Sequence, residues 1–178
     1  MHFNVLSKDP QLEEQLLPLE TIQDHLRVYD SSENDLLTLY RSAAFDFASA
    51  YMNRILGRAT LITTFEDFKP VMFLPMGKAS EVLSVQGMFG DHLINVDDYH
   101  LNPIAGMLVL KDKWKPLKHF TVTYTVNEEV PKVVLLGILK LIAHFYEVRE
   151  EVAMGVSVTQ IPTNHRACFD LYRLKVAG

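Results

Sequence analysis

The sequence predicts an α+β fold, a mostly helical bundle of about four helices with a small antiparallel β meander inserted between the second and third helices. Three observations support this prediction. Apolar residues recur at steps of three and four in the first third and the last third of the chain. The middle instead holds short β-prone segments separated by Gly, Pro and Asn turn residues. No strand alternates with a helix in the order that a parallel sheet requires.

The first two helices are expected over about 19–28 and about 33–56. Pro18 stands where a helix can begin, because its fixed backbone angle suits the first helical turn. Ser31 and Ser32 lie in a turn where the hydroxyl of either residue can accept a hydrogen bond from an unpaired amide of the second helix. Gly57 is the expected left-handed residue that ends this helix.

The β region is expected over about 59–126, as short antiparallel strands with turn residues between them. Its last segment alternates Thr with apolar residues, which is typical of a half-buried strand. The first residues of the chain, around Phe3 and Val5, alternate loosely and predict a short strand or an arm. A single domain over 1–178 accommodates all of these elements, since 178 residues is an ordinary domain size.

The third and fourth helices are expected over about 131–151 and about 164–175. The third helix is apolar on nearly all sides, so most of its surface needs cover. In a domain of this size the cover can come from another subunit. The same argument applies to apolar residues that lie off the main stripe of the second helix. The predicted subunit-interface residues are Leu39, Phe45, Leu139 and Phe145.

The composition excludes several classes of protein. The net charge is −5, which argues against a dedicated nucleic-acid binder, because such a protein needs a basic face for phosphates. The single cysteine, Cys168, excludes an internal disulfide and a cysteine-rich zinc site. The start of the chain does not read as a signal peptide, and the apolar run 133–143 is too short to cross a bilayer. We therefore expect no membrane association and a reducing cytoplasm as the compartment of synthesis.

Two residue pairs are compatible with enzyme chemistry. His144 and Glu147 are three positions apart on a helix, a spacing that lets both bind one metal ion, although a complete site needs further ligands. His165 and Cys168 have the same spacing, and a histidine base can activate a thiol. A polar stripe and a small packing residue are the more common explanations. No phosphate-binding or nucleophile motif is present, so the sequence favours an assembly component without a cofactor over an enzyme.

Four stretches of the chain, in order, resemble one family of phage proteins. They are the segment ending His25-Leu26-Arg27-Val28, the segment from Glu33 to Gly57-Arg58-Ala59, the strand Val122-Thr123-Tyr124-Thr125, and Pro131 followed by 141–150. Together they resemble the head–tail connector or head-completion adaptor family, the HK97-like and phiE125-like connector proteins.

This resemblance implies a structural role in a phage or prophage neck. Such proteins assemble in the host cytoplasm into a ring, about twelve-fold, beneath the portal protein, and they join the DNA-filled head to a stopper or tail protein. DNA only passes through the channel. The resemblance also points to a C-terminal element that docks on the portal, with Phe169, Leu171, Tyr172 and Arg173 as its anchors. The alternatives are another neck or tail component, such as a stopper or tail terminator, or a small metal-dependent enzyme.

Overall fold

The computed structural model describes residues 2–148 and 164–174. The chain forms two compact units. The β unit comprises Met1–Asp9 and Asn53–Glu129, and the helical unit comprises Pro10–Met52 and Val130–Gly178. Each unit therefore combines two separate stretches of the sequence, and each has its own buried core.

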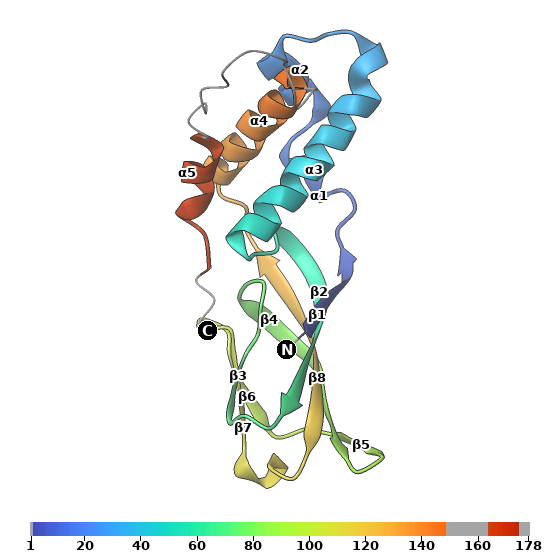
Figure 1. Ribbon diagram of the computed structural model, residues 1–178, viewed down its shortest axis with the longest axis vertical. Coiled ribbons are helices and arrows are strands. Elements are labelled where there is room, and N and C mark those ends of the chain that lie inside the picture. Colours follow the sequence, from blue (N-terminus) through green and yellow to red (C-terminus); the bar gives the residue numbers. More distant parts are fainter. Residues whose placement is uncertain (1, 149–163, 175–178) are drawn as a thin grey trace, which may run out of the picture. The chain divides into compact units, whose positions relative to one another are not determined.

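The β unit holds two antiparallel sheets (Figure 1). The five-stranded sheet has the order β1-β2-β8-β4-β5, and the three-stranded sheet has the order β3-β7-β6. Their strands are β1 (His2–Lys8), β2 (Gly57–Asp67), β3 (Val71–Phe73), β4 (Ala79–Phe89), β5 (His92–Asn95), β6 (Tyr99–Asn102), β7 (Met107–Leu110) and β8 (Lys118–Glu128).

The core of the β unit follows from the alternation of its strands. In β2 every second residue is buried, and the same holds along most of β8. The register places Leu61 opposite Tyr124 and Phe65 opposite Phe120, so the buried residues of the two strands share one face of the sheet. Both sheets contribute side chains to a single apolar cluster. We call this buried side of the five-stranded sheet the core face and the opposite side the outer face.

Tyr124 shows how the core accommodates a polar group. Its hydroxyl donates a hydrogen bond to the Pro75 carbonyl at 2.8 Å. Burial raises the pKa of Tyr124 to about 12, against a smaller lowering by Thr63. The phenol therefore stays neutral, and its hydrogen bond holds the loop after β3 against the central strand.

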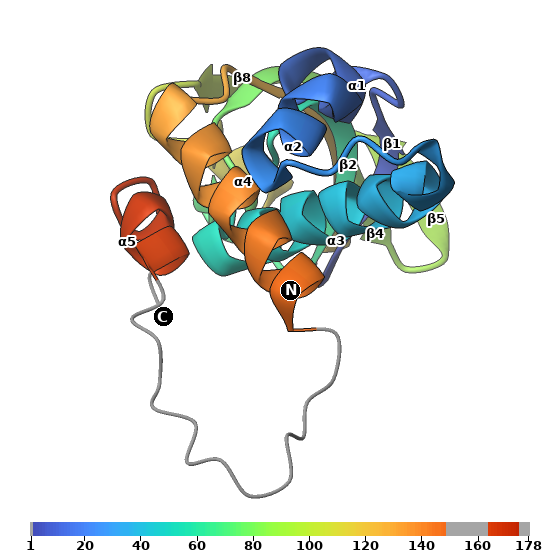
Figure 2. The same ribbon diagram turned by 90° about the horizontal axis from the view of Figure 1, so that it is seen from above.

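The helical unit contains five α-helices among its described residues: α1 (Leu12–Leu16), α2 (Leu19–Leu26), α3 (Asn34–Met52), α4 (Lys132–Glu147) and α5 (Asn164–Asp170). Figure 2 shows α5 alongside α4, and α4 crossing α3. The core of the unit consists of fully buried apolar residues on four of these helices, which include Ile22, Leu37, Ala48, Ile138 and Phe169. The described residues contain no helix that is both long enough and apolar enough to cross a membrane.

The prediction of a mostly helical bundle with a small β meander is wrong. The described residues are 38% helical and 35% strand, in sheets of five and three strands. The strands β2, β4 and β8 each run for 11 residues, far longer than the short segments expected from the sequence. Polar residues such as Thr64 and Ser84 interrupt the apolar pattern, yet they belong to strands, because their side chains lie on the outer face of the sheet.

The second helix also ends earlier than expected. Asn53 adopts a left-handed backbone with φ 53°, which stops α3 at Met52. Gly57 has a positive φ of 81°, but it opens β2 and does not cap the helix. The third helix ends at Glu147, and the remainder of its expected span, from residue 149 on, lies outside the described residues.

Candidate assembly interfaces

The four residues predicted to lie between subunits differ in exposure. Leu39 on α3 is 62% exposed, whereas Phe45 on the same helix is buried in the helical unit. Leu139 and Phe145 on α4 are half-buried, and the Phe145 ring lies 6.0 Å from the Tyr40 ring. Leu39, Leu139 and Phe145 therefore leave apolar side-chain surface accessible, and Phe45 packs within its own unit.

The C-terminal element is anchored by close packing between α5 and α4. Phe169 is fully buried, and Gly137 leaves the space that its ring occupies. A Cβ on Gly137 would stand 2.6 Å from Cε1 of Phe169, so only glycine permits this approach. After α5, the Leu174 N–H donates to the Met52 carbonyl at 2.9 Å. The helix and the residues that follow it are therefore held on the helical unit.

The other three predicted portal-docking residues lie beyond this anchor. Leu171 is 74% exposed, Tyr172 is half-buried, and Arg173 is exposed. The Arg173 guanidinium lies 5.0 Å from the centre of the Tyr51 ring, and the Tyr51 hydroxyl donates to Asp170 at 2.8 Å. The structure thus gathers Leu171, Tyr172 and Arg173 on one turn, and separates them from the buried Phe169.

The residues considered for enzyme chemistry do not form a complete site. His144 and Glu147 are exposed on α4, and no group of three or more His, Cys, Asp and Glu side chains in the described parts of the chain could hold a metal ion. His165 and Cys168 are buried on α5, in the packing against α4. The His165 ring lies 6.5 Å from the His144 ring. Burial, with smaller effects of Arg166 and His144, lowers the pKa of His165 from its ordinary value and so favours the neutral ring.

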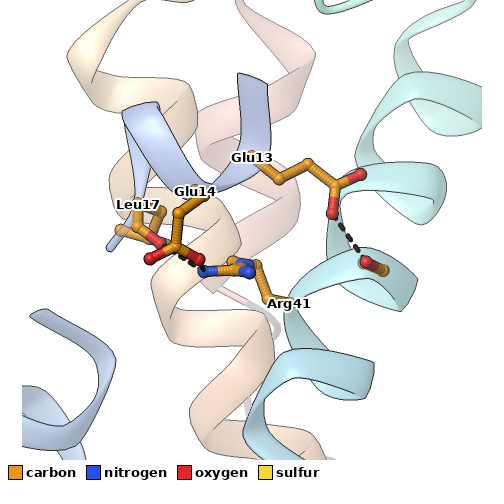
Figure 3. A network of polar contacts seen from close by, with 5 residues as sticks. Glu13, Glu14, Leu17 and Arg41 are labelled. Carbon is orange, nitrogen blue, oxygen red and sulfur yellow. Dashed lines mark hydrogen bonds and ion pairs between the residues drawn. The ribbon is translucent and has the colours of Figure 1, made fainter. Parts of the chain in front are cut away.

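A buried arginine links α1 to α3 (Figure 3). Arg41 of α3 donates to the Leu17 carbonyl at 3.3 Å and forms an ion pair with Glu14. The neighbouring Ser42 donates to Glu13 at 2.6 Å. The short helix α1 has no buried residue of its own, so these polar contacts hold it in place. Sequence reasoning missed α1 and this network, because five residues carry too little periodicity to predict a helix.

Both edges of the five-stranded sheet expose apolar side chains. At one edge, every residue of β1 is exposed, including Phe3, Val5 and Leu6. At the other edge, Leu93 of β5 is 58% exposed and Phe89, at the end of β4, is 57% exposed. A long edge strand with apolar residues and no proline is a site where another strand can pair. The alternation of Phe3 and Val5 was the only sequence signal for this surface.

The structure resembles known proteins over the whole chain. A chain in the neck of an empty gene transfer agent (GTA) particle, computed with C6 symmetry, matches with a TM-score of 0.72 at 18% identity, covering 100% of this chain and 98% of that chain. A chain in the virion of a native GTA particle matches with a TM-score of 0.75 at 18% identity and the same coverage. A chain in the neck of a native GTA particle, computed with C12 symmetry, matches with a TM-score of 0.68 at 15% identity, again covering 100% and 98%.

These likenesses establish the fold: it is one that occurs in structural chains of a virion and its neck. No family model matches the sequence. No curated protein is similar to it in sequence.

Proposed function

We propose that this chain is a structural neck protein of a phage, a prophage or a related particle, and that it acts as a head-completion adaptor. In this role, copies of the chain form a ring beneath the portal protein and join the filled head to a stopper or tail protein. The observation that carries the proposal is the likeness to GTA neck chains over 100% of this chain and 98% of theirs. The ordered connector motifs of the sequence support it independently.

The surface of the molecule suits an assembly role. Apolar side chains are exposed on the sheet edges, on the helical unit and on the three-stranded sheet, where Val71, Phe73 and Val109 lie on one face. Several separate apolar surfaces are expected of a subunit that has neighbours in a ring and partners above and below it. The net charge of −5 suits a channel that lets DNA pass without holding it.

The surface proposed for the portal protein is the turn after α5. Leu171 and Arg173 lie on the turn that directly follows α5, and this helix is fixed by the buried Phe169. Exposed apolar and arginine side chains on a rigid support are typical anchors of protein interfaces. The ring neighbours are proposed to contact Leu39, Leu139 and Phe145.

The proposal is tested first in the particle. Deleting the gene from the genome that encodes it should leave DNA-filled heads without tails, and electron microscopy of complemented particles should show the chain as a ring in the neck. Tailed, infectious particles without this protein would overturn the proposal. Heads that keep this chain and lose only later components would instead indicate a stopper or tail terminator.

The portal-docking surface is tested with purified proteins. Leu171→Asp should weaken binding to the portal protein of the same genome more than about tenfold, because it places a charge in an apolar contact. Ile104→Asp is a matched control, since Ile104 is 81% exposed on a turn of the β unit. Equal loss of portal binding in both variants would contradict the assignment to the C-terminal turn.

A further inference from the structure

The five-stranded sheet has two unpaired edges among the described residues. β1 pairs with β2 alone, and β5 pairs with β4 alone. An edge strand offers a row of backbone donors and acceptors that bind water in the free subunit and that another extended strand can pair with. The chemistry of both edges therefore suits a strand as the occupant.

One hydrogen bond identifies which backbone groups of β5 point away from β4. The Val96 N–H donates to the Val85 carbonyl at 2.9 Å, so these two residues form a hydrogen-bonded pair. Bonded and non-bonded pairs alternate along an antiparallel ladder. Leu93 and Asn95, opposite Met88 and Gln86, are thus in non-bonded pairs. Their N–H and C=O groups point away from β4 to the free edge.

The same reasoning applies to β1. The Asp9 N–H donates to the Arg58 carbonyl, so the even-numbered residues of β2 turn their backbone groups toward β1. Thr64 and Ile62 therefore form hydrogen-bonded pairs with His2 and Asn4, which lie opposite them. The N–H and C=O groups of Phe3 and Val5 therefore point to the free edge.

The two edges run in the same direction. In the sheet order β1-β2-β8-β4-β5, each of the four neighbouring pairs of strands is antiparallel. The two edge strands, β1 and β5, therefore run parallel to each other. In a cyclic ring of about twelve copies, neighbouring copies differ by a small rotation that does not reverse a strand. Joining β5 of one copy to β1 of the next thus gives a parallel pair.

The faces of the sheet match in this parallel arrangement. Phe3 and Val5 lie opposite Thr63 and Leu61 on the core face. Leu93 lies on the outer face, because its neighbour Ile94 is opposite Gly87, which faces the core residue Leu117. In a parallel ladder a residue bonds to the two residues that flank the one opposite it.

Leu93 would therefore bond to Phe3 and Val5 of the neighbouring copy and lie opposite its Asn4, with both side chains on the outer face. An antiparallel joint between the same edges would place Leu93, on the outer face, opposite Phe3 or Val5, which lie on the core face. The core face of one sheet would then continue into the outer face of the next.

We propose that neighbouring copies of this chain join their five-stranded sheets edge to edge, β5 of one copy pairing in parallel with β1 of the next. The occupant of each edge is thus a second copy, and the contact is head-to-tail, as a closed ring requires. This inference rests on the ring of the proposed function and adds the strands that form it.

Disulfide trapping tests the joint in the full chain. Asn4→Cys and Leu93→Cys are introduced together on a Cys168→Ser background, which removes the native thiol. Within one chain these positions lie four strand spacings apart, roughly 19 Å, too far for a disulfide. Oxidation at about 1 mM protein, where even a contact with a millimolar Kd is populated, should give a ladder of linked multimers that ends at a closed ring.

A single-cysteine variant and a matched double variant distinguish the proposed joint from other arrangements of the two edges. Asn4→Cys alone gives linked dimers only if two β1 edges pair with each other, and that result without a ladder would overturn the proposal. The matched control combines Asn4→Cys with His92→Cys, which lies one residue away on the core face and should link poorly. Absence of any linked species in the Asn4→Cys, Leu93→Cys chain would also overturn the proposal.

A second pair of variants tests the backbone bonds. Leu93→Pro removes an outward N–H without removing a bond to β4, and proline is tolerated on such an edge. It should raise the Kd of self-association by about tenfold or more. Leu93→Thr keeps the N–H and should have a smaller effect. Equal association of the two variants would overturn the proposal, provided that both show wild-type circular dichroism.

The outcomes separate this inference from the proposed function. Failure of cross-linking together with tailless particles on gene deletion would leave the neck role intact and remove the sheet joint. A cross-linked ladder together with normal particles after gene deletion would leave the joint and remove the neck role.

Discussion

At the residue scale, His165 couples the packing of α5 to pH. Burial lowers the pKa of this ring below the ordinary value of 6.5. Below that pH the unfolded chain binds a proton that the folded chain resists, so stability is complete above pH 6.5 and falls as the pH is lowered. Urea unfolding of the wild type at pH 7.5 and 5.5 should show this loss. His165→Phe should reduce it, whereas substitution of the exposed His2 by Gln should not. An unchanged pH dependence in His165→Phe would contradict this account.

Arg41 is the second residue with a testable role. Its side chain is 8% exposed and holds α1 through Glu14 and the Leu17 carbonyl. Arg41→Ala should lower the free energy of unfolding by about 2 kcal/mol, because it removes buried hydrogen bonds and packing. Glu14→Gln should cost less than about 1 kcal/mol, since the Glu14 side chain is half exposed and screened by water. Equal losses measured by urea unfolding would show that the ion pair, and not the arginine packing, holds α1.

At the element scale, the contact between α4 and α5 depends on the absence of one side chain. Ala is about 1 kcal/mol better than Gly in a free helix, yet in Gly137→Ala the new Cβ would meet Phe169 at 2.6 Å and Cys168 Cβ at 2.9 Å. We expect a net destabilisation of about 1–3 kcal/mol and faster hydrogen exchange in α5.

Two further variants of the α4–α5 contact separate packing from helix propensity. Gly137→Ala combined with Phe169→Leu should recover part of the loss, because the smaller side chain makes room. Lys132→Ala, on the exposed first turn of α4, should leave hydrogen exchange in α5 unchanged. Faster exchange in Lys132→Ala would contradict a local steric cause.

At the scale of the whole molecule, the head-to-tail joint predicts the behaviour of mixtures. Val5→Pro blocks the β1 edge and Leu93→Pro blocks the β5 edge, so each variant alone should stay monomeric. Each chain keeps one intact edge. The mixture should therefore form a one-to-one complex and nothing larger, as measured by native mass spectrometry. Larger assemblies in the mixture, or dimers of Leu93→Pro alone, would contradict the joint.

The helices and the strands differed in how far the sequence determined them. The helices expected over 19–28 and 131–151 correspond to α2 (Leu19–Leu26) and α4 (Lys132–Glu147), because periodic apolar faces and starting prolines are local signals. The lengths of the strands were not determined by local sequence signals. The strand β4 contains Ser84 and Gly87 and reads as interrupted, yet it extends over 11 residues because β8 and β5 pair with it.

The interface residues show the same division. Sequence periodicity marked Phe45 as a surplus apolar residue, and the resemblance to connector proteins marked Phe169 as a docking anchor, but both are buried within the helical unit. A pattern along one helix shows which side chains need cover and does not show which element covers them. Gly137 decides the outcome for Phe169, since its missing side chain leaves room for the ring.

The sequence by itself determined four of the five described helices, the approximate extent of the central β region and the resemblance to connector proteins, because caps, turns and short motifs are encoded by adjacent residues. Only the tertiary structure decided that the chain folds as two units from interleaved segments, and that β1, far from β2 in sequence, forms one edge of a five-stranded sheet. Strand pairing joins residues that are distant along the chain through backbone groups common to all residues, so no local pattern records which strands become neighbours.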